Sequence, residues 1–350
     1  MEQKFTPVSE TGRYRLIKDI TKQLGDRGDS VGRLVKSIGD DCAVVRGADG
    51  KFLLYSSETF IEGVDFDLTY TPLTHLGYKL ITASVSDILA MNGKPEFLMI
   101  SIGIPNKIST EMIHSLYDGL IRASDVYSCP IIGGDITASP GSLVISITVN
   151  GTVSEEKIAY RSGAQIGDAI CVTGDLGAAY AGLKILLREK AVWGQESNDA
   201  EFAPDLADYE YVVKRQLLPE GRNDLIETLE KQNMSPTSMI DISKNALQDL
   251  MQLISSSKKG AQVFEAAIPI ALETRAVADE LQDDVTQYAL QGGEDFEILF
   301  TLPEKQVNDL VNHFKDFVVI GRVTSQNEGF RMQMASGEEM HFDLSEMSQA

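Results

Sequence analysis

Apolar and polar residues alternate most regularly between Leu143 and Val153. Ile145, Ile147 and Val149 would share one face of a strand, with polar residues between them, and this pattern is typical of a half-buried β-strand. Other segments rich in β-branched and aliphatic residues are bounded by turn residues and predict further strands: Cys42 to Val45, Phe52 to Ser57 and Phe97 to Ile104. Helical spacing of apolar residues predicts helices over Leu73 to Asn92, capped by Asn92-Gly93, and over Thr110 to Tyr127.

The pattern restarts after Ala159. A short apolar strand is predicted over Asp168 to Thr173, and the glycine turn 174–177 leads into a helix over Ala178 to Lys190. The polar stretch from Gln195 to Asp208 predicts a surface loop. The remaining elements are helices around Leu225, from Lys244 to Ser255 and after Leu272, a strand from Gln262 to Ile268, and a second glycine turn, Gly292-Gly293-Glu294-Asp295, before a strand from Phe296 to Phe300.

Length and composition favour a globular protein of two domains. The chain has 350 residues, of which 43% are hydrophobic and 24% charged, so it is long for one core and easily supports two. We place the boundary near Ala159, which gives domains 1–159 and 160–350. No low-complexity linker or short repeat separates them, so we expect close packing.

The charge of the chain narrows the classes of partner. The formal net charge is −21, and binding to nucleic acid or an anionic membrane surface would add electrostatic repulsion.

Cys42, Cys129 and Cys171 are far apart and lie among apolar residues, which indicates reduced core positions and no disulfide framework. Residues 1–10 are polar and no apolar run has membrane-spanning length. These features predict a soluble cytoplasmic enzyme.

Four short acidic motifs, each with a neighbouring glycine or serine, carry the chemistry. Mg²⁺ is usually held by one or two carboxylates while phosphates and water complete its shell, and glycine exposes backbone N–H groups to phosphate. We therefore expect a metal-dependent site for a phosphorylated nucleotide. The motifs are Gly39-Asp40-Asp41 before a strand, Ser86-Asp87 in an apolar helical stretch, Gly133-Gly134-Asp135 with the two glycines ending a strand, and Asp241-Ile242-Ser243.

Two of the motifs also have an ordinary explanation. Gly39-Asp40-Asp41 could be an acidic turn, and Asp87 could face solvent or bond to a neighbouring helix end as well as bind a metal. Competing catalytic patterns are missing from the sequence, which has neither a phosphate loop ending in Gly-Lys-Ser/Thr nor a Gly-x-Gly-x-x-Gly fingerprint. The four histidines are isolated, which gives a catalytic triad or a histidine metal cluster little support.

The motifs occur together in the order of a known family. The chain resembles the thiamine-monophosphate kinases of the aminoimidazole-ribonucleotide (AIR) synthetase-like superfamily from about Gly39 to about Phe300. The matching residues are the acidic motifs above, with Cys42-Ala43 after the first, Leu76-Gly77-Tyr78-Lys79, Ser86 to Met91, Arg161-Ser162-Gly163-Ala164, Gly167-Asp168 and Gly292 to Glu297.

The resemblance implies both a fold and a reaction. It implies an α+β N-terminal domain whose strands form a barrel across a homodimer, and an α/β C-terminal domain over a cleft. ATP would phosphorylate thiamine monophosphate directly, without a covalent intermediate or a catalytic nucleophile, because phosphoryl transfer needs charge neutralisation and alignment above all.

The resemblance also assigns roles to single residues. It implies Mg²⁺ ligands at Asp40, Asp41, Ser56, Glu58, Asp87, Asp135 and Asp241. It implies nucleotide contacts at Ser57, Gly134, Asp135, Arg161 and Ser243, and substrate contacts at Asp65 and Glu294.

Departures from the family pattern leave the activity open. Glu58 stands where the family has Asp, Asp65 replaces a substrate-contacting His, and Lys244-Asn245-Ala246 replaces Asp-Gly-Leu. His341-Phe342 keeps only half of the C-terminal motif, because Glu338-Glu339 stands where glycine and an aromatic residue are usual. Lys244 could replace one Mg²⁺ as a point charge on phosphate. Alternatively, the protein is a divergent paralogue that binds nucleotide or metal with weak, altered or no kinase activity. Amidine or selenophosphate formation is a third possibility.

Overall fold

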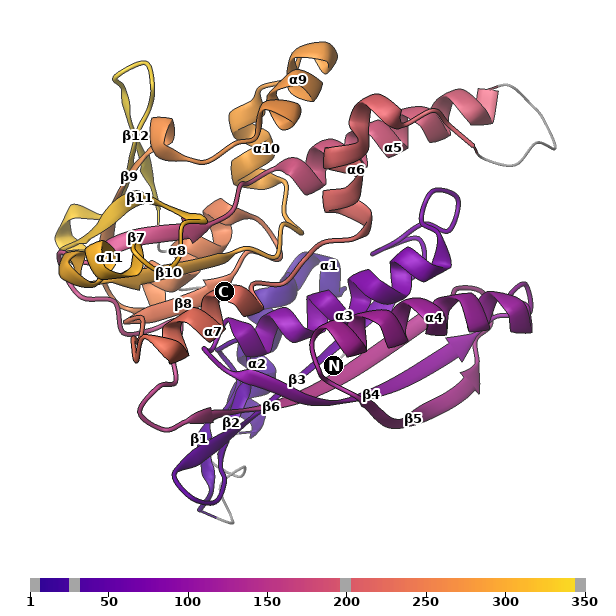
Figure 1. Ribbon diagram of the computed structural model, residues 1–350, viewed down its shortest axis with the longest axis horizontal. Coiled ribbons are helices and arrows are strands. Elements are labelled where there is room, and N and C mark those ends of the chain that lie inside the picture. Colours follow the sequence, from indigo (N-terminus) through magenta and orange to yellow (C-terminus); the bar gives the residue numbers. More distant parts are fainter. Residues whose placement is uncertain (1–6, 25–31, 196–202, 344–350) are drawn as a thin grey trace, which may run out of the picture.

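The computed structural model describes residues 7–24, 32–195 and 203–343. They form two mixed β-sheets with helices packed against them (Figure 1). Helices α1 (Val8–Thr11) and α2 (Arg13–Leu24) precede the first strand. None of the helices in these ranges is long and apolar enough to cross a membrane.

The first sheet has six strands in the order β1-β2-β3-β6-β4-β5, and only β4 and β5 pair in parallel. Helices α3 (Leu73–Leu89) and α4 (Thr110–Val126) lie across one face of it (Figure 1). The alternation predicted for residues 143–153 is confirmed, because Ile145, Ile147 and Val149 are buried between partly exposed neighbours. The strands are β1 (Leu34–Lys36), β2 (Ala43–Arg46), β3 (Lys51–Ile61), β4 (Lys94–Ile104), β5 (Ile131–Ala138) and β6 (Val144–Ser154).

The second sheet has seven strands in the order β13-β12-β9-β11-β7-β10-β8, and β9 pairs in parallel with β12. Its strands are β7 (Ala169–Thr173), β8 (Ser238–Asp241), β9 (Gly260–Phe264), β10 (Ile298–Leu302), β11 (Phe317–Thr324), β12 (Phe330–Gln333) and β13 (Glu339–Phe342). The helices around it are α5 (Ala178–Gln195), α6 (Glu210–Leu217), α7 (Asn223–Lys231), α8 (Ala246–Ser256), α9 (Leu272–Leu281), α10 (Val285–Gln291) and α11 (Glu304–Leu310).

Residues of the second sheet contribute to two separate cores. Ile170, Val172 and Ile240 belong to a cluster with residues of α8. Their neighbours Cys171 and Met239 belong to a continuous core that includes α7 and helix α3 of the first half of the chain. Because successive side chains of a strand point to opposite faces, each face of the sheet packs in a different core. The two halves of the chain are therefore packed closely, as we expected.

Several predicted elements differ from the structure. Gly133 and Gly134 lie within β5, although the sequence predicted that they end a strand, and the last predicted strand, 296–300, is instead β10 at Ile298–Leu302. The predicted strand 262–268 ends at Phe264, where a 3₁₀ turn begins. Helix α5 extends to Gln195, the first residue of the predicted loop 195–208. Residues 196–202 of that loop lie outside the described residues, and its end forms a 3₁₀ turn at Ala207–Tyr209.

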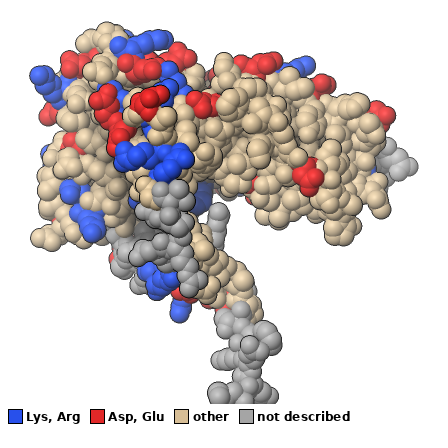
Figure 2. Space-filling view, turned by 90° about the horizontal axis from the view of Figure 1, so that it is seen from below, with Lys and Arg blue, Asp and Glu red and all other residues tan. Residues whose placement is uncertain are grey.

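The first sheet has one uncovered face. Tyr55, Phe97 and Met99 alternate with buried residues on β3 and β4 and are 41%, 42% and 49% exposed. Ile136 of the edge strand β5 is 64% exposed but pairs with the buried Ile102, so it belongs to the opposite face. Seen from below, the broad surface on the right of Figure 2 carries few charged side chains. Neither sheet closes into a barrel within the described part of a single chain.

Candidate active site

Three carboxylates from distant parts of the chain meet between the two sheets. Asp41 precedes β2, Asp87 lies in α3 and Asp241 is the last residue of β8. One oxygen of each lies within 4.8 Å of the others. Opposite ligands of one Mg²⁺ are about 4.2 Å apart, twice a metal–oxygen bond, so this spacing is close to that of a divalent cation site.

Hydrogen bonds orient the cluster but leave oxygens open. Ser56 Oγ donates to Asp87, and Ser86 Oγ donates to Asp241 Oδ2 at 2.7 Å. Arg161 Nη2 donates to Asp41 Oδ1 at 2.6 Å. The second oxygen of Asp41 is buried and accepts no hydrogen bond, and the same holds for one oxygen of Glu58. The corresponding oxygen of Asp40 lies 3.6 Å from Lys36 Nζ, in an ion pair. Buried acceptors of this kind are costly unless a cation or a donor reaches them.

The electrostatics of the cluster also fit a cation. Burial, together with the neighbouring charges of Glu58, Asp241 and Asp41, raises the pKa of Asp87 well above its usual value. Burial and Asp41 raise the pKa of Asp241 to about 6, and burial and Asp241 raise the pKa of Glu58 to about 7. Carboxylates that repel one another in a dry site gain most from a bound divalent cation. The residues present therefore fit Mg²⁺.

A cavity of about 520 Å³ opens beside the cluster. Residues of the second half that line it include Ser243, Lys244, Glu294 and Phe296. From the first half, the cavity is lined by Asp41, Ser56, Ser57, Glu58, Asp65 and Asp87. Most of the predicted site residues thus share one cavity.

A second cavity of about 350 Å³ shares Asp65 and Glu294 with the first. Glu294 accepts from Lys79 Nζ at 2.9 Å and from Gln216 Nε2 at 3.3 Å. Asp65 accepts from the backbone N–H of Ile61 at 2.7 Å, so one of its oxygens is already used in a turn. The second cavity is thus lined by three acids, Asp65, Asp67 and Glu294, and by the buried Lys79.

Gly134 and Asp135 are not brought to this cluster within one chain. Asp135 pairs through Ser101 and Ser146 with Thr59 of β3. Its exposed side chain is three strands away, or about 14 Å at the usual strand spacing. Its metal role and the nucleotide role of Gly134 stay predictions.

The sequence analysis missed two buried charged residues of the site, Lys79 and Asp249. Asp249 Oδ2 accepts from the backbone N–H groups of Lys244 and Asn245 at 3.3 and 3.2 Å, and burial raises its pKa to about 8. Asn245 followed by an acid in the first helical turn was an available signal for a helix start. Nothing local marks Lys79, whose partner Glu294 is 215 residues away.

The aromatic half of the C-terminal motif lies elsewhere. Phe342 is on the edge strand β13, and its ring packs against Phe330 with centroids 4.9 Å apart. Phe342 does not line either cavity described here.

Comparisons with known proteins place this geometry in a family. Residues 39–153 match the model described as AIR synthase related protein, N-terminal domain. The chain is 32% identical over 322 residues to thiamine-monophosphate kinase of Aquifex aeolicus (strain VF5), covering 92% of this chain and 94% of that protein. It is also 32% identical to thiamine-monophosphate kinase of Escherichia coli (strain K12), covering 83% of this chain and 85% of that protein.

Solved structures agree in fold. AaThiL complexed with AMPPCP and TMP has a TM-score of 0.81 at 28% identity, covering 97% of this chain and 98% of that one. The hydrogenase maturation protein HypE in complex with ATP, at 18% identity and a TM-score of 0.63, shares the fold alone. From the length and identity of these matches, the chain belongs to the thiamine-monophosphate kinase family.

Proposed function

We propose that this protein transfers the γ-phosphoryl group of ATP to thiamine monophosphate and so forms thiamine diphosphate, in a reaction that requires Mg²⁺. The observation that carries the proposal is the meeting of Asp41, Asp87 and Asp241 beside a cavity of about 520 Å³. The neighbour complexed with AMPPCP and TMP supports the two substrates.

Different residues in and around the cluster would bind the metal and orient the nucleotide. Asp40, Asp41, Ser56, Glu58, Asp87 and Asp241 would hold Mg²⁺, which supplies charge neutralisation on the phosphates. Ser57, Arg161 and Ser243 orient the nucleotide. No side chain acts as a nucleophile, because alignment and neutralised charge suffice for direct transfer.

The acceptor enters from the side of Asp65 and Glu294. Glu294 receives hydrogen bonds from Lys79 and Gln216, which hold its carboxylate at the wall of both cavities. An acid held in this way can attract the positive ring of thiamine.

We propose that the active form is a homodimer in which the uncovered faces of two first sheets close a barrel. The exposed side chains of Phe97 and Met99 and the scarcity of charge on this face (Figure 2), in a chain of net charge −21, support an interface. The unpaired edge of β5 supports it as well, since natural sheets seldom leave an edge open. Gly134 and Asp135 lie on this edge strand, so their roles depend on the assembly.

A cytoplasmic location completes the proposal. It is supported by the free, buried state of all three cysteines.

The alternative is a divergent paralogue with weak, altered or no kinase activity. It is favoured by Lys244, whose charge acts on Glu58 and Asp249 inside the cavity, and by the acid at Asp65. Product detection after incubation with ATP, Mg²⁺ and thiamine monophosphate decides between the two. No thiamine diphosphate at high enzyme concentration would overturn the kinase, and turnover restored by Lys244→Asp with Asp65→His would support degeneracy.

A further inference from the structure

The segment from Gly292 to Glu297, which leads into β10, has an unusual backbone. Glu294 and Phe296 have φ angles of 59° and 51°, and Gly293 has 82°. Residues other than glycine rarely adopt these left-handed φ angles. The backbone strain that results persists only where the surrounding structure imposes it. Glu294 and Phe296 are also the two residues of this segment that line the cavity beside Asp41, Asp87 and Asp241. These three acids are called the metal cluster below.

The residues between and after them point the other way and are anchored. Asp295 is 1% exposed and accepts from the backbone N–H groups of Gly177 and Ala179, at the start of α5, at 2.9 and 3.3 Å. Glu297 is also 1% exposed and accepts from Thr173 Oγ1 at 2.6 Å. The segment therefore alternates between cavity-facing and anchored side chains.

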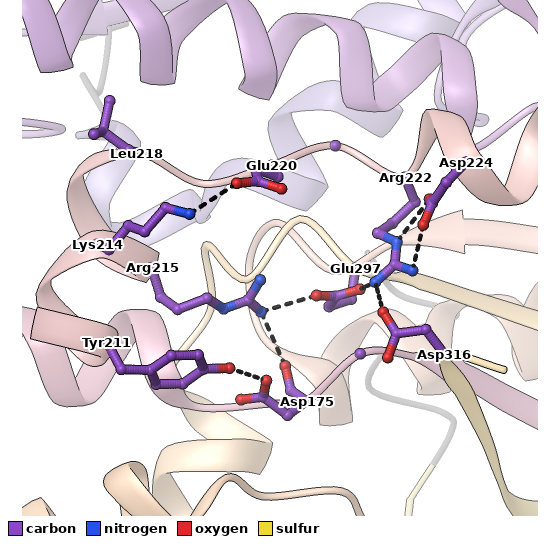
Figure 3. A pocket seen from close by; sticks show the side chains of 12 residues that line it. Asp175, Tyr211, Lys214, Arg215, Leu218, Glu220, Arg222, Asp224, Glu297 and Asp316 are labelled. Atoms are coloured by element: carbon purple, nitrogen blue, oxygen red, sulfur yellow. Dashed lines mark hydrogen bonds and ion pairs between the residues drawn. The ribbon is translucent and has the colours of Figure 1, made fainter.

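Two arginines hold Glu297 from opposite sides (Figure 3). Arg215 of α6 and Arg222, just before α7, each place a guanidinium nitrogen 2.9 Å from a carboxylate oxygen of Glu297. Arg215 also donates to the backbone carbonyl of Asp175 at 3.0 Å. We call these three residues, Arg215, Arg222 and Glu297, the arginine clamp.

The clamp is tied to the first domain. The segment between α6 and α7 contains Pro219 and Gly221. The carbonyl of Pro219 accepts from Thr82 Oγ1 at 3.3 Å, and the N–H of Gly221 donates to Tyr127 Oη at 2.8 Å. Thr82 lies in α3, the helix that carries Asp87. The position of Glu297 is therefore fixed relative to the metal cluster.

Backbone bonds carry this position to Glu294 and Phe296. The N–H of Ile242 donates to the carbonyl of Glu297 at 2.8 Å, and the N–H of Phe296 donates back to Ile242 at 3.0 Å. The N–H of Glu294 donates to the carbonyl of Ser243 at 3.0 Å. If Glu297 moved, the strained backbone of this segment could relax. The side chains of Glu294 and Phe296 would then no longer be held toward the cavity.

We infer that Arg215 and Arg222 are positioning residues for the acceptor phosphate ester: by clamping Glu297 they keep Glu294 and Phe296 turned into the cavity. The role in acceptor binding rests on the proposed function, whereas the control of the strained segment does not. Neither arginine lines the cavity of the metal cluster, although Ile242 and Ser243 bond to the same segment, so ATP binding should depend on the arginines less than acceptor binding does.

The kinetic test uses Arg215→Gln, with Arg188→Gln as the matched control. Arg188 lies in α5 and pairs with Glu280 at 2.7 Å, away from Glu297. For Arg215→Gln we expect KM for thiamine monophosphate to rise about tenfold, the usual scale for losing one hydrogen bond to a charged group, with a smaller rise in KM for ATP. Arg215→Lys, which keeps the charge, should recover part of the loss.

A double variant separates positioning from general damage. If Arg215 acts through Glu294, Arg215→Gln combined with Glu294→Gln should raise KM for the acceptor no further than Glu294→Gln alone. Additive effects, or equal losses for both substrates, would overturn the inference.

Hydrogen exchange tests the clamp without any turnover. We expect faster amide exchange over residues 292–297 in Arg215→Gln and no change in Arg188→Gln, because only the first substitution frees the segment. Unchanged exchange in Arg215→Gln would refute the clamp. If the unmodified protein makes no thiamine diphosphate, the proposed function fails, and the exchange result still decides whether the clamp exists.

Discussion

Ser86 Oγ donates a hydrogen bond to Asp241 Oδ2 at 2.7 Å and so joins a helix of the first half of the chain to a strand of the second. The next residue, Asp87, is bonded by Ser56 of β3. Two successive residues of α3 therefore take part in the cluster: Ser86 orients Asp241, and Asp87 is itself oriented by Ser56. Relative movement of the two halves would separate Asp241 from Asp87, so we expect metal binding at the proposed site to be linked to closure of the halves.

Asp87→Asn should stabilise the metal-free protein and abolish phosphoryl transfer. Asp87 is half-buried, and burial together with the charges of Glu58 and Asp241 raises its pKa. Replacing its carboxylate therefore removes a destabilising charge that is retained for function. We expect a gain of roughly 1 kcal/mol, or a rise in Tm of a few degrees, measured by calorimetry in EDTA.

Two comparisons make this result decisive. Asp125→Asn, at an exposed position of α4, should change neither property. Added Mg²⁺ should raise the Tm of the unmodified protein and leave that of Asp87→Asn nearly unchanged. A variant that is less stable in EDTA would show that Asp87 contributes to the fold and not to a metal site.

Stability of the metal-free protein should fall as pH rises from about 4 to about 8. Burial raises the folded pKa of Asp249 to about 8 from 3.8, so the folded state holds a proton that the unfolded state has released in this window, and stability decreases with pH. Asp249→Asn should flatten the profile, as measured by urea unfolding at several pH values in EDTA. An unchanged slope would mean that Asp249 is ionised in the folded protein.

The sequence could predict the individual carboxylates because each lies in a recognisable local setting. Helix α3 was predictable from its apolar spacing, and Asp87 stood out as an acid within it. That Asp41 and Asp241 lie within 4.8 Å of Asp87 depends on the packing of both sheets, which no local pattern encodes. Lys79 and Arg215 were missed for the same reason, because their partners Glu294 and Glu297 are distant in the sequence.

Gly133-Gly134 shows how a correct motif can be placed in the wrong element. Two glycines after an apolar run favour a strand end, yet both lie inside β5. A Cβ at Gly134 would lie 1.6 Å from the carbonyl oxygen of Ile100, so this glycine allows β5 to approach β4. Gly134 is therefore required by close packing of its backbone against β4, and a local pattern in β5 cannot show this contact.

Lys244→Ala should lower kcat/KM for ATP about 100-fold if the ammonium group of Lys244 contacts a phosphate of ATP. A loss of this size is usual when one hydrogen-bond donor to a transition state is removed. Lys244 lines the cavity beside the metal cluster. Lys244→Arg should retain part of the activity, and Lys258→Ala, at an exposed position, serves as the control. Steady-state formation of thiamine diphosphate measures all three. Full activity of Lys244→Ala would exclude phosphate contact.

Phe97→Lys combined with Met99→Lys should convert a dimer into a monomer. Both side chains lie on the uncovered face of the first sheet and are 42% and 49% exposed in the single chain, so two charges there would have to be buried in the proposed barrel. Sedimentation velocity at micromolar concentration measures the change, with Leu272→Lys, at a more exposed apolar position of α9 (79%), as the control. If the barrel also brings Gly134 and Asp135 to the nucleotide, the monomer should lose activity while its Tm in EDTA changes little. A fully active monomer would remove the dimer from the catalytic site and leave Asp135 without a role there.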